Sequence, residues 1–143
     1  MSPELRMIET NGVRLRVALA GDGPLVILVH GFPESWYSWR HQIEALSRAG
    51  YRVAAPDARG YGGSDRPHDV EAYDMESLTG DIAGLAAALS PDERAVVVGH
   101  DWGAPIAWNT ARLHADRFRA VAGLSVPYLP PGDVVFIDAA RAL

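Results

Sequence analysis

AVVVGHDWGAP, at residues 95–105, joins a run of β-branched residues to a turn of the pattern Gly-x-Asp-x-Gly. The apolar run at 95–98 predicts a buried strand, and the pattern that begins near Gly103 and continues to Leu113 predicts a helix. Only a sharp turn fits between them, and its two glycines permit one. A strand, a tight turn and a helix in this order are typical of a nucleophile elbow, whose central residue, here Asp101, projects above the sheet.

Asp101 is therefore the candidate nucleophile. It is expected at a helix N-terminus, where free N–H groups and the helix dipole stabilise negative charge. A carboxylate is already ionised at neutral pH, and its attack on a saturated carbon forms an alkyl ester. The attacked carbon must belong to a strained ring or carry a good leaving group. Hydrolysis of the ester then requires an oxyanion hole, to which the backbone N–H of Trp102 is expected to contribute.

The same pattern allows two other roles for Asp101. An aspartate before a helix can simply cap it. A metal site built on His100 and Asp101 would need third and fourth ligands, and the sequence has none at usable spacing. We therefore expect no metal ion, and we expect His100 to be a packing residue whose side chain points away from Asp101.

Three further apolar runs predict strands on either side of this stretch. LVILV at residues 25–29 is apolar throughout, as is typical of a strand covered on both faces. Residues 52–55, RVAA, predict a second buried strand, and residues 120–126 predict a fourth strand after the one at 95–98. The prolines that end this last strand are Pro127, Pro130 and Pro131.

Helices and a hairpin complete the predicted order. One helix carries Trp36, Trp39, Ile43 and Leu46 at helical spacing and is stopped by Gly50, and another covers residues 73–89. Near the N-terminus, Asn11-Gly12 separates two strand-like segments and suits a two-residue hairpin turn. This order predicts an α/β fold with a mostly parallel sheet and an N-terminal antiparallel hairpin. In such folds functional residues gather at the carboxyl ends of the strands.

The loop His30-Gly31-Phe32-Pro33 follows the strand at 25–29. A second oxyanion donor is expected from this loop, namely the backbone N–H of Phe32, the residue after the glycine. The Phe32 ring would then line the pocket. The Phe32–Pro33 bond can be cis at low cost. His30 is expected to be a hydrogen-bonded structural residue.

The loop at residues 57–64, DARGYGGS, follows the strand at 52–55. It is not a P-loop, because no Gly-Lys-Ser/Thr follows it, and it is not a dinucleotide-binding motif, because no Gly-x-Gly-x-x-Gly lies at a strand–helix junction. We interpret it as a structural loop beside the oxyanion loop. Asp57 and Arg59 are expected to form a fixed polar pair with each other rather than to act as catalysts.

Composition excludes several classes of function. With 143 residues the chain is large enough for one small domain, and its net charge of −5 argues against a nucleic-acid partner. It has no cysteine, which excludes disulfides, a thiol nucleophile and a thiolate zinc site. No apolar run approaches the about 20 residues of a membrane span, and the N-terminus does not read as a secretory signal. We expect a cytoplasmic protein without a membrane partner.

Taken together, the three loops resemble a known family. The segment at residues 30–40, HGFPESWYSWR, is similar to the oxyanion segment of soluble and bacterial epoxide hydrolases of the α/β-hydrolase fold, and RGYG at 59–62 and GHDWGA at 99–104 also resemble that family's motifs. The resemblance extends from Leu5 to Pro131. It implies that Asp101 is the nucleophile, that Phe32 and Trp102 form the oxyanion hole, and that Phe32, Pro33 and Trp102 line the substrate pocket. It implies an epoxide substrate, a vicinal diol product and no cofactor.

The chain departs from this family after residue 131. The family's lid, with two tyrosines that hydrogen-bond the epoxide oxygen, has no counterpart here, nor have the late histidine and its acidic partner. The five histidines all precede residue 115. We therefore expect residues 1–143 to be the N-terminal part of a single core domain, truncated before the lid and the last strands. A remaining C-terminal segment or a partner chain would complete it, and an ester on Asp101 would persist without a base to activate water.

Two alternatives remain open at this point. A haloalkane dehalogenase would use the same nucleophile, although such enzymes commonly have asparagine at the position of Phe32, and a fluoroacetate-type enzyme would have arginine at that of Trp102. The chain can also be a non-catalytic fragment that needs a partner chain, because the histidine is missing.

Overall fold

The computed structural model describes residues 2–130, in which six strands form one sheet in the order β1-β2-β4-β3-β5-β6. The β1–β2 and β2–β4 pairs are antiparallel, and the other three pairs are parallel. The strands are β1 (Glu4–Thr10), β2 (Val13–Ala20), β3 (Leu25–Val29), β4 (Arg52–Pro56), β5 (Ala95–His100) and β6 (Phe118–Leu124). The predicted mostly parallel sheet with an N-terminal antiparallel hairpin is confirmed.

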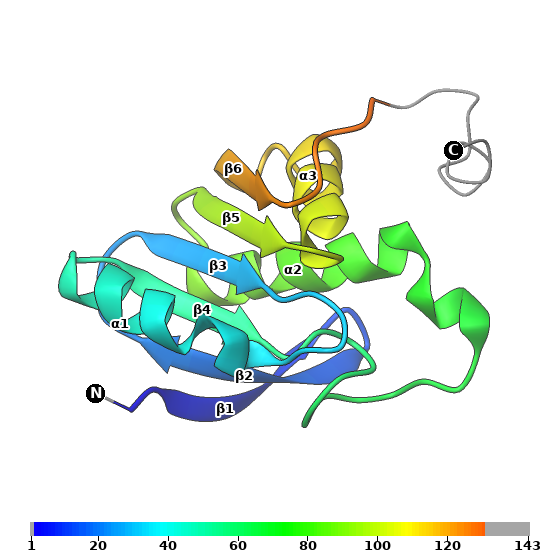
Figure 1. The fold of residues 1–143 in the computed structure, drawn as a ribbon, viewed down its shortest axis with the longest axis horizontal. Coiled ribbons are helices and arrows are strands. Elements are labelled where there is room, and N and C mark those ends of the chain that lie inside the picture. Colours follow the sequence, from blue (N-terminus) through cyan, green and yellow to red (C-terminus); the bar gives the residue numbers. More distant parts are fainter. Residues whose placement is uncertain (1, 131–143) are drawn as a thin grey trace.

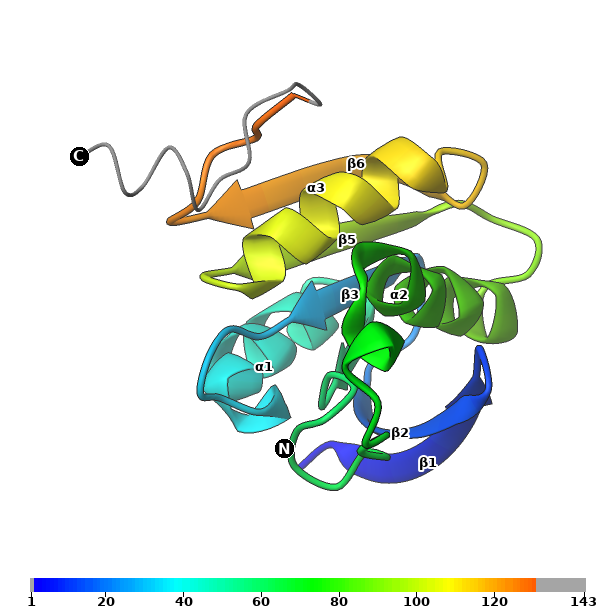
Figure 2. The same cartoon turned by 90° about the vertical axis from the view of Figure 1, so that its right-hand side faces the viewer.

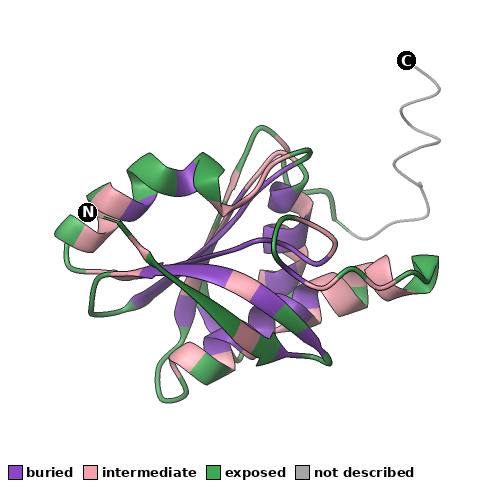
Figure 3. Cartoon of the chain, turned by 90° about the horizontal axis from the view of Figure 1, so that it is seen from below, coloured by how far each residue is buried: buried purple, intermediate pink, exposed green. Residues whose placement is uncertain are grey.

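The hairpin turns where the sequence predicts it. Asn11 and Gly12 have φ of 51° and 81°, the positive values that a tight two-residue turn requires. In β2, Val13 and Leu15 are buried, and Arg14 between them is exposed. Exposed residues dominate β1, which is an edge strand (Figure 3).

Helices cover both faces of the sheet (Figure 1). α1 (Arg40–Arg48) packs on one face, and α2 (Met75–Leu89) and α3 (Gly103–Leu113) pack side by side on the other (Figure 2). In β3, Leu25, Ile27 and Val29 belong to the core under α2 and α3, and Val26 and Leu28 belong to the core under α1. Successive strand residues point to opposite faces, so an uninterrupted apolar run fits a strand with helices on both sides.

Both helices predicted before residue 90 are preceded by a short 3-10 helix. η1 (Trp36–Trp39) leads into α1, which ends before Gly50 as predicted. η2 (Val70–Tyr73) leads into α2, so the helix predicted to begin at residue 73 begins instead at Met75. Asp74 separates the two, because its backbone is extended and its carboxylate accepts a hydrogen bond from the Ser77 N–H at 2.7 Å. This is an N-cap, which sequence spacing alone did not locate.

The last two strands are less buried than predicted. β5 alternates, with Val96 and Val98 only half-buried, and they line an open hollow of about 510 Å³ on the α1 side. β6 ends at Leu124, two residues earlier than predicted, and most of it is exposed. The physical reason is coverage, since α1 contacts β2 and β4 and leaves this part of the sheet open. Of the prolines predicted to end β6, Pro131 lies outside the described residues.

Strand pairing brings the three loops of interest to one edge of the sheet. Val29 of β3 lies opposite Gly99 of β5, which lies opposite Gly123 of β6, and β4 flanks β3 on the other side. These strands are parallel, so their carboxyl ends meet at the same edge. The loops at 30–35, 57–64 and 99–103 therefore lie next to one another.

Candidate active site

The turn between β5 and α3 holds Asp101 in an uncommon backbone conformation. Its φ is +57°, in the left-handed region that few residues other than glycine occupy. Two backbone hydrogen bonds fix it, from Asp101 N–H to the Leu124 carbonyl at 3.2 Å and from Ala104 N–H to the Asp101 carbonyl at 3.0 Å. At Gly103 any side chain would collide with the carbonyls of Val29 and His30, so this glycine lets α3 approach the sheet closely.

One carboxylate oxygen of Asp101 lies between two backbone donors. Oδ2 accepts a hydrogen bond from Phe32 N–H at 3.0 Å and another from Trp102 N–H at 2.6 Å. Within residues 2–130, no further hydrogen bond reaches this carboxylate. These are the two N–H groups that were expected from the sequence to converge on Asp101, and the structure brings them together.

The pKa of the Asp101 carboxyl is lowered from its ordinary value. The main cause is the hydrogen bond from Phe32 N–H, followed by the one from Trp102 N–H, and partial burial acts in the opposite direction. His100 contributes a smaller lowering through its charge. Hydrogen bonds to the charged form favour that form, so the carboxylate is ionised well below neutral pH.

The loop after β3 is shaped to reach Asp101. A side chain at Gly31 would lie 2.7 Å from Asp101 Oδ2, so only glycine leaves room for the carboxylate. The Phe32–Pro33 bond is cis, as the sequence analysis allowed. His30 is buried and hydrogen-bonded at both ring nitrogens, to Gly31 O and Ala58 N, as expected of a structural histidine.

Asp101 opens into a largely apolar hollow. This hollow has a volume of about 320 Å³, and Asp101 is the charged residue of its lining. It lies over the first turns of α3 and the segment after β6. The other lining residues are Met75, Trp102, Pro105, Trp108, Asn109, Val126, Pro127 and Leu129.

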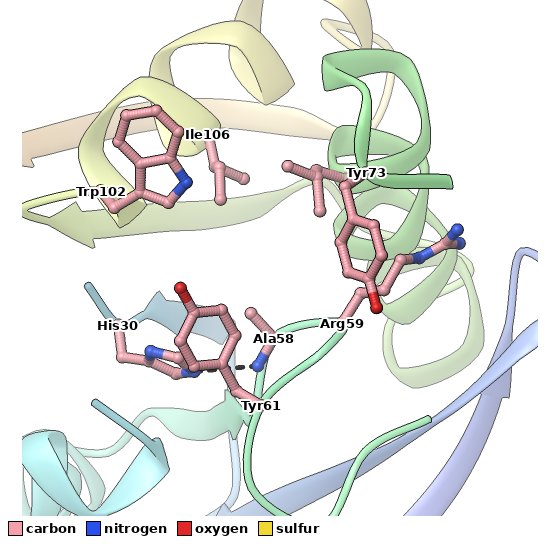
Figure 4. A pocket seen from close by; sticks show the side chains of 8 residues that line it. His30, Ala58, Arg59, Tyr61, Tyr73, Trp102 and Ile106 are labelled. Atoms are coloured by element: carbon pink, nitrogen blue, oxygen red, sulfur yellow. Dashed lines mark hydrogen bonds between the residues drawn. The ribbon is translucent and has the colours of Figure 1, made fainter. Parts of the chain in front are cut away.

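The Trp102 side chain also borders a second hollow of about 180 Å³ (Figure 4). The Tyr61 hydroxyl points from the loop after β4 toward the Trp102 indole, and Tyr73 and Ile106 form other walls. The pKa of Tyr61 is raised, mainly by burial and secondarily by the negative charge of Asp101. Trp102 thus lines both hollows, and its contact with a substrate stays a prediction.

Phe32 and Pro33 line neither of these two hollows among the described residues. Both are exposed, with 67% of Phe32 accessible to solvent. Their contribution to a substrate pocket stays a prediction. Three other lining residues were not predicted from the sequence, namely Pro105, Trp108 and Asn109. They follow Asp101 by four, seven and eight residues, a helical spacing that places them on one face of α3.

The loop at 57–64 corrects one prediction. Asp57 and Arg59 do not pair with each other. The buried Asp57 carboxylate binds Arg16 at 2.8 Å and accepts hydrogen bonds from the Trp36 and Gly63 N–H groups. Arg59 instead binds Asp81 on α2. The two side chains leave the loop toward different elements, so each makes a fixed polar pair with a partner distant in the sequence.

The His100 side chain is 42% exposed, and its Nδ1 lies 3.6 Å from Glu34 Oε1. It therefore packs against the protein only in part, and its expected role as a packing residue rather than a catalyst stays a prediction. Within residues 2–130, His, Asp and Glu form no group of three or more that could hold a metal ion. In the same range, none of the helices combines the length and apolar character needed to cross a membrane.

Comparison with known proteins identifies relatives of the whole chain. A family model described as the α/β hydrolase fold matches residues 24–141. Epoxide hydrolase A of Mycobacterium tuberculosis is 59% identical over 99% of this chain and 44% of its own length. Epoxide hydrolase B of the same organism is 50% identical over 92% of this chain and 38% of its own length. This chain therefore spans less than half the length of these relatives.

Solved structures give the same result. An epoxide hydrolase from Vigna radiata superposes with a TM-score of 0.93 at 45% identity, over 99% of this chain and 44% of that one. Epoxide Hydrolase A from Mycobacterium thermoresistibile superposes with a TM-score of 0.92 at 55% identity and the same coverage.

Proposed function

The chain belongs to the α/β-hydrolase fold family, and on that premise we propose that it is the nucleophile-bearing part of an epoxide hydrolase. The observation that carries the proposal is the Asp101 carboxylate, with Oδ2 held by two backbone N–H groups. The names of its relatives support an epoxide as the substrate class.

In the proposed first step, Asp101 Oδ1 attacks a ring carbon of the epoxide. The new bond joins Oδ1 to that carbon, the ring C–O bond breaks with its electron pair on oxygen, and the resulting alkoxide takes a proton from water. Asp101 Oδ2 becomes the carbonyl oxygen of the ester. Oδ1 is free for this attack because the hydrogen bonds to Phe32 and Trp102 are made by Oδ2 alone.

In the proposed second step, water attacks the ester carbonyl carbon. Negative charge develops on Oδ2, between the Phe32 and Trp102 N–H groups, which act as the oxyanion hole. The bond between the carbonyl carbon and Oδ1 then breaks, and Oδ1 leaves with the substrate carbon and takes one proton of the attacking water, which completes the vicinal diol. The other proton of that water neutralises the hydroxide left by the first step, and the oxygen of the water becomes part of the restored carboxylate. No metal or cofactor is used in either step.

The hollow beside Asp101 favours an apolar substrate. Its lining consists mainly of aromatic, proline and aliphatic side chains, with Asn109 as the neutral polar group. Burial of apolar substrate surface against such a lining would supply binding energy. Phe32 and Pro33 are proposed to contact the substrate from the opposite loop.

We further propose that residues 1–143 form the N-terminal part of one α/β-hydrolase core domain. A further segment or a partner chain is proposed to complete that domain. Support comes from the half-buried Val96 and Val98 in their open hollow and from the exposed strand β6. Full turnover, with its general base, is proposed for the complete domain.

Ester formation on Asp101 tests the proposed function. The chain is incubated with styrene oxide, and the intact mass and the peptide masses are then measured. We expect one adduct per chain, located at Asp101 and absent from Asp101→Asn. The adduct should persist, because within residues 2–130 the carboxylate is hydrogen-bonded to backbone N–H groups and to no side-chain base.

Three outcomes would contradict this proposal. The first is an adduct that forms equally on Asp101→Asn. The second is steady diol release without any trapped adduct. The third is reaction with a bromoalkane and not with the epoxide, which would favour a dehalogenase.

A further inference from the structure

His30 contacts the peptide unit that supplies one of the two N–H groups on Asp101. Its Nδ1 lies 2.8 Å from the carbonyl oxygen of Gly31, and its Nε2 lies 2.9 Å from the backbone nitrogen of Ala58 (Figure 4). The ring is buried, with 2% of the residue exposed. The mechanism proposed above does not use this side chain.

These two contacts fix the protonation of the ring. A backbone N–H can only donate, so the nitrogen facing Ala58 must accept and carries no proton. A carbonyl oxygen can only accept, so the nitrogen facing Gly31 must donate. The structure therefore requires the neutral tautomer with hydrogen on Nδ1. Consistently, burial lowers the pKa of His30, although the Gly31 hydrogen bond and the charges of Asp57 and Glu34 oppose this effect.

The Gly31 carbonyl and the Phe32 N–H belong to one planar peptide unit. Within residues 2–130 the only cis bond is Phe32–Pro33, so the Gly31–Phe32 bond is trans, and its C=O and N–H point in opposite directions. Holding the carbonyl oxygen on one side therefore directs the N–H to the other side. On that other side, Asp101 Oδ2 lies 3.0 Å from the Phe32 nitrogen.

We propose that His30 is a positioning residue for the oxyanion hole, because its Nδ1–H holds the Gly31 carbonyl and so aims the Phe32 N–H at Asp101 Oδ2. The Glu34 N–H donates to the same carbonyl at 3.0 Å. The bond from Glu34 only closes the local turn. The bond from His30 Nδ1 instead ties the Gly31–Phe32 peptide unit to the buried end of β3. Because His30 Nε2 also accepts from Ala58 N–H, the same side chain links this peptide unit to the loop after β4. This inference rests on the proposed function, because that function makes the Phe32 N–H part of an oxyanion hole. The hydrogen bonds that hold this N–H in place are observed in the structure.

Two substitutions separate the two hydrogen bonds of His30. In His30→Asn, the amide nitrogen stands as many bonds from the backbone as Nδ1 and can keep the bond to Gly31. In His30→Gln, the amide oxygen stands as far out as Nε2 and can keep the bond to Ala58. If His30 only links the two loops, His30→Gln is the milder change. If it aims the Phe32 N–H, His30→Asn is the milder change at Asp101.

The readout is the pKa of Asp101, followed by carboxyl ¹³C NMR of the whole chain and assigned with Asp101→Asn. The Phe32 N–H is the largest cause of the lowered pKa of Asp101. We expect His30→Gln to raise this pKa toward its ordinary value and His30→Asn to leave it closer to that of the unmodified chain. His41→Asn, at an exposed histidine, is the matched control and should cause no shift. Equal shifts in both His30 variants, a larger shift in His30→Asn, or no shift in either would overturn the proposal.

A second measurement tests the proposal on the unmodified chain, so its result does not depend on whether a His30 variant folds. Ring ¹⁵N NMR of the unmodified chain at pH 7 should show His30 protonated at Nδ1 and unprotonated at Nε2. The opposite tautomer, or a doubly protonated ring, would overturn the proposal. Neither NMR measurement depends on reaction with an epoxide. Failure of the adduct experiment would therefore refute the proposed function without being confused with failure of this inference.

Discussion

Replacing Asp81 by asparagine should destabilise the fold more than any surface charge change. Asp81 and Arg59 are almost fully buried, with side chains 3% and 6% exposed, and their closest atoms lie 2.7 Å apart. The Asp81 carboxylate also accepts from Arg59 Nε at 2.9 Å and from Asn11 Nδ2 at 3.1 Å. Asp81→Asn would leave the Arg59 guanidinium buried without its counter-charge.

Loss of one partner of a buried ion pair costs about 3–5 kcal/mol. This is a large share of the about 5–15 kcal/mol by which a typical domain is stable. An exposed pair offers a matched comparison, because Arg48 and Glu44 on α1 are also 2.7 Å apart but 71% and 38% exposed. Glu44→Gln should cost only about 0.3–0.5 kcal/mol, the usual value for an i,i+4 surface pair.

Urea unfolding followed by circular dichroism measures both free-energy changes. The double variant Arg59→Met/Asp81→Leu completes the comparison, since an apolar pair removes both charges together. We expect the double variant to lose less free energy of unfolding than the sum of the losses in the single variants Arg59→Met and Asp81→Leu. A cost for Asp81→Asn as small as that of Glu44→Gln would refute the reasoning that burial decides the strength of this pair.

Three further predictions follow from the site and the core. The pKa of Asp101 is lowered, chiefly by the Phe32 N–H, so the rate of ester formation should stay constant as pH falls through the ordinary aspartate range. The rate should drop only at lower pH, where the Asp101 carboxylate takes up a proton. A drop in the rate within the ordinary aspartate range, after subtraction of the rate measured with Asp101→Asn, would contradict this prediction. Gly31→Ala would introduce a Cβ 2.7 Å from Asp101 Oδ2, and we expect slower adduct formation by mass measurement in a chain that still folds. An unchanged rate would argue against a tight fit there. Thr110 is fully buried, and within residues 2–130 its Oγ1 has no hydrogen-bond partner, so Thr110→Val should raise the free energy of unfolding by about 1 kcal/mol. Thr79→Val, which loses a 2.8 Å bond to the Met75 carbonyl, should lower it, and equal effects of the two changes in urea unfolding would refute the comparison.

Features set by neighbouring residues were predictable from the sequence. The apolar run at 25–29 required a strand covered on both faces, and Asn11-Gly12 required a hairpin turn. Both follow from local conformational preferences and from side-chain periodicity. The turn around Asp101 belongs to the same class, because its glycines, its strand and its helix are contiguous. These local patterns were sufficient for the fold class and for the turn that places Trp102 N–H beside Asp101. The approach of Phe32, which is 69 residues away from Asp101, was expected only because the loop after the first buried strand supplies an oxyanion donor in this fold.

Features that depend on distant partners were not predictable in the same way. Asp57 and Arg59 are two residues apart, which suggested a pair, yet their partners Arg16 and Asp81 lie 41 and 22 residues away. Only the sheet order brings those residues to the loop. The half-burial of Val96 has the same origin, because an apolar residue in a strand does not reveal whether a helix covers it.

The position of Asp101 Oδ2 links the fold to the proposed chemistry. A hole formed by free N–H groups would have to exchange bound water before it stabilised an oxyanion. Here the two N–H groups already hold Asp101 Oδ2, the oxygen that becomes the ester carbonyl in the proposed mechanism, so under that proposal the same contacts persist from carboxylate to ester to tetrahedral intermediate. The cost of this arrangement falls on the fold, as a positive φ at Asp101 and a helix packed against the sheet at Gly103. Strain of about 1–3 kcal/mol at one residue is tolerable when parallel strands and buried polar pairs fix the loops around it. The electrostatic stabilisation is then built in during folding, and little reorganisation is left for the reaction itself.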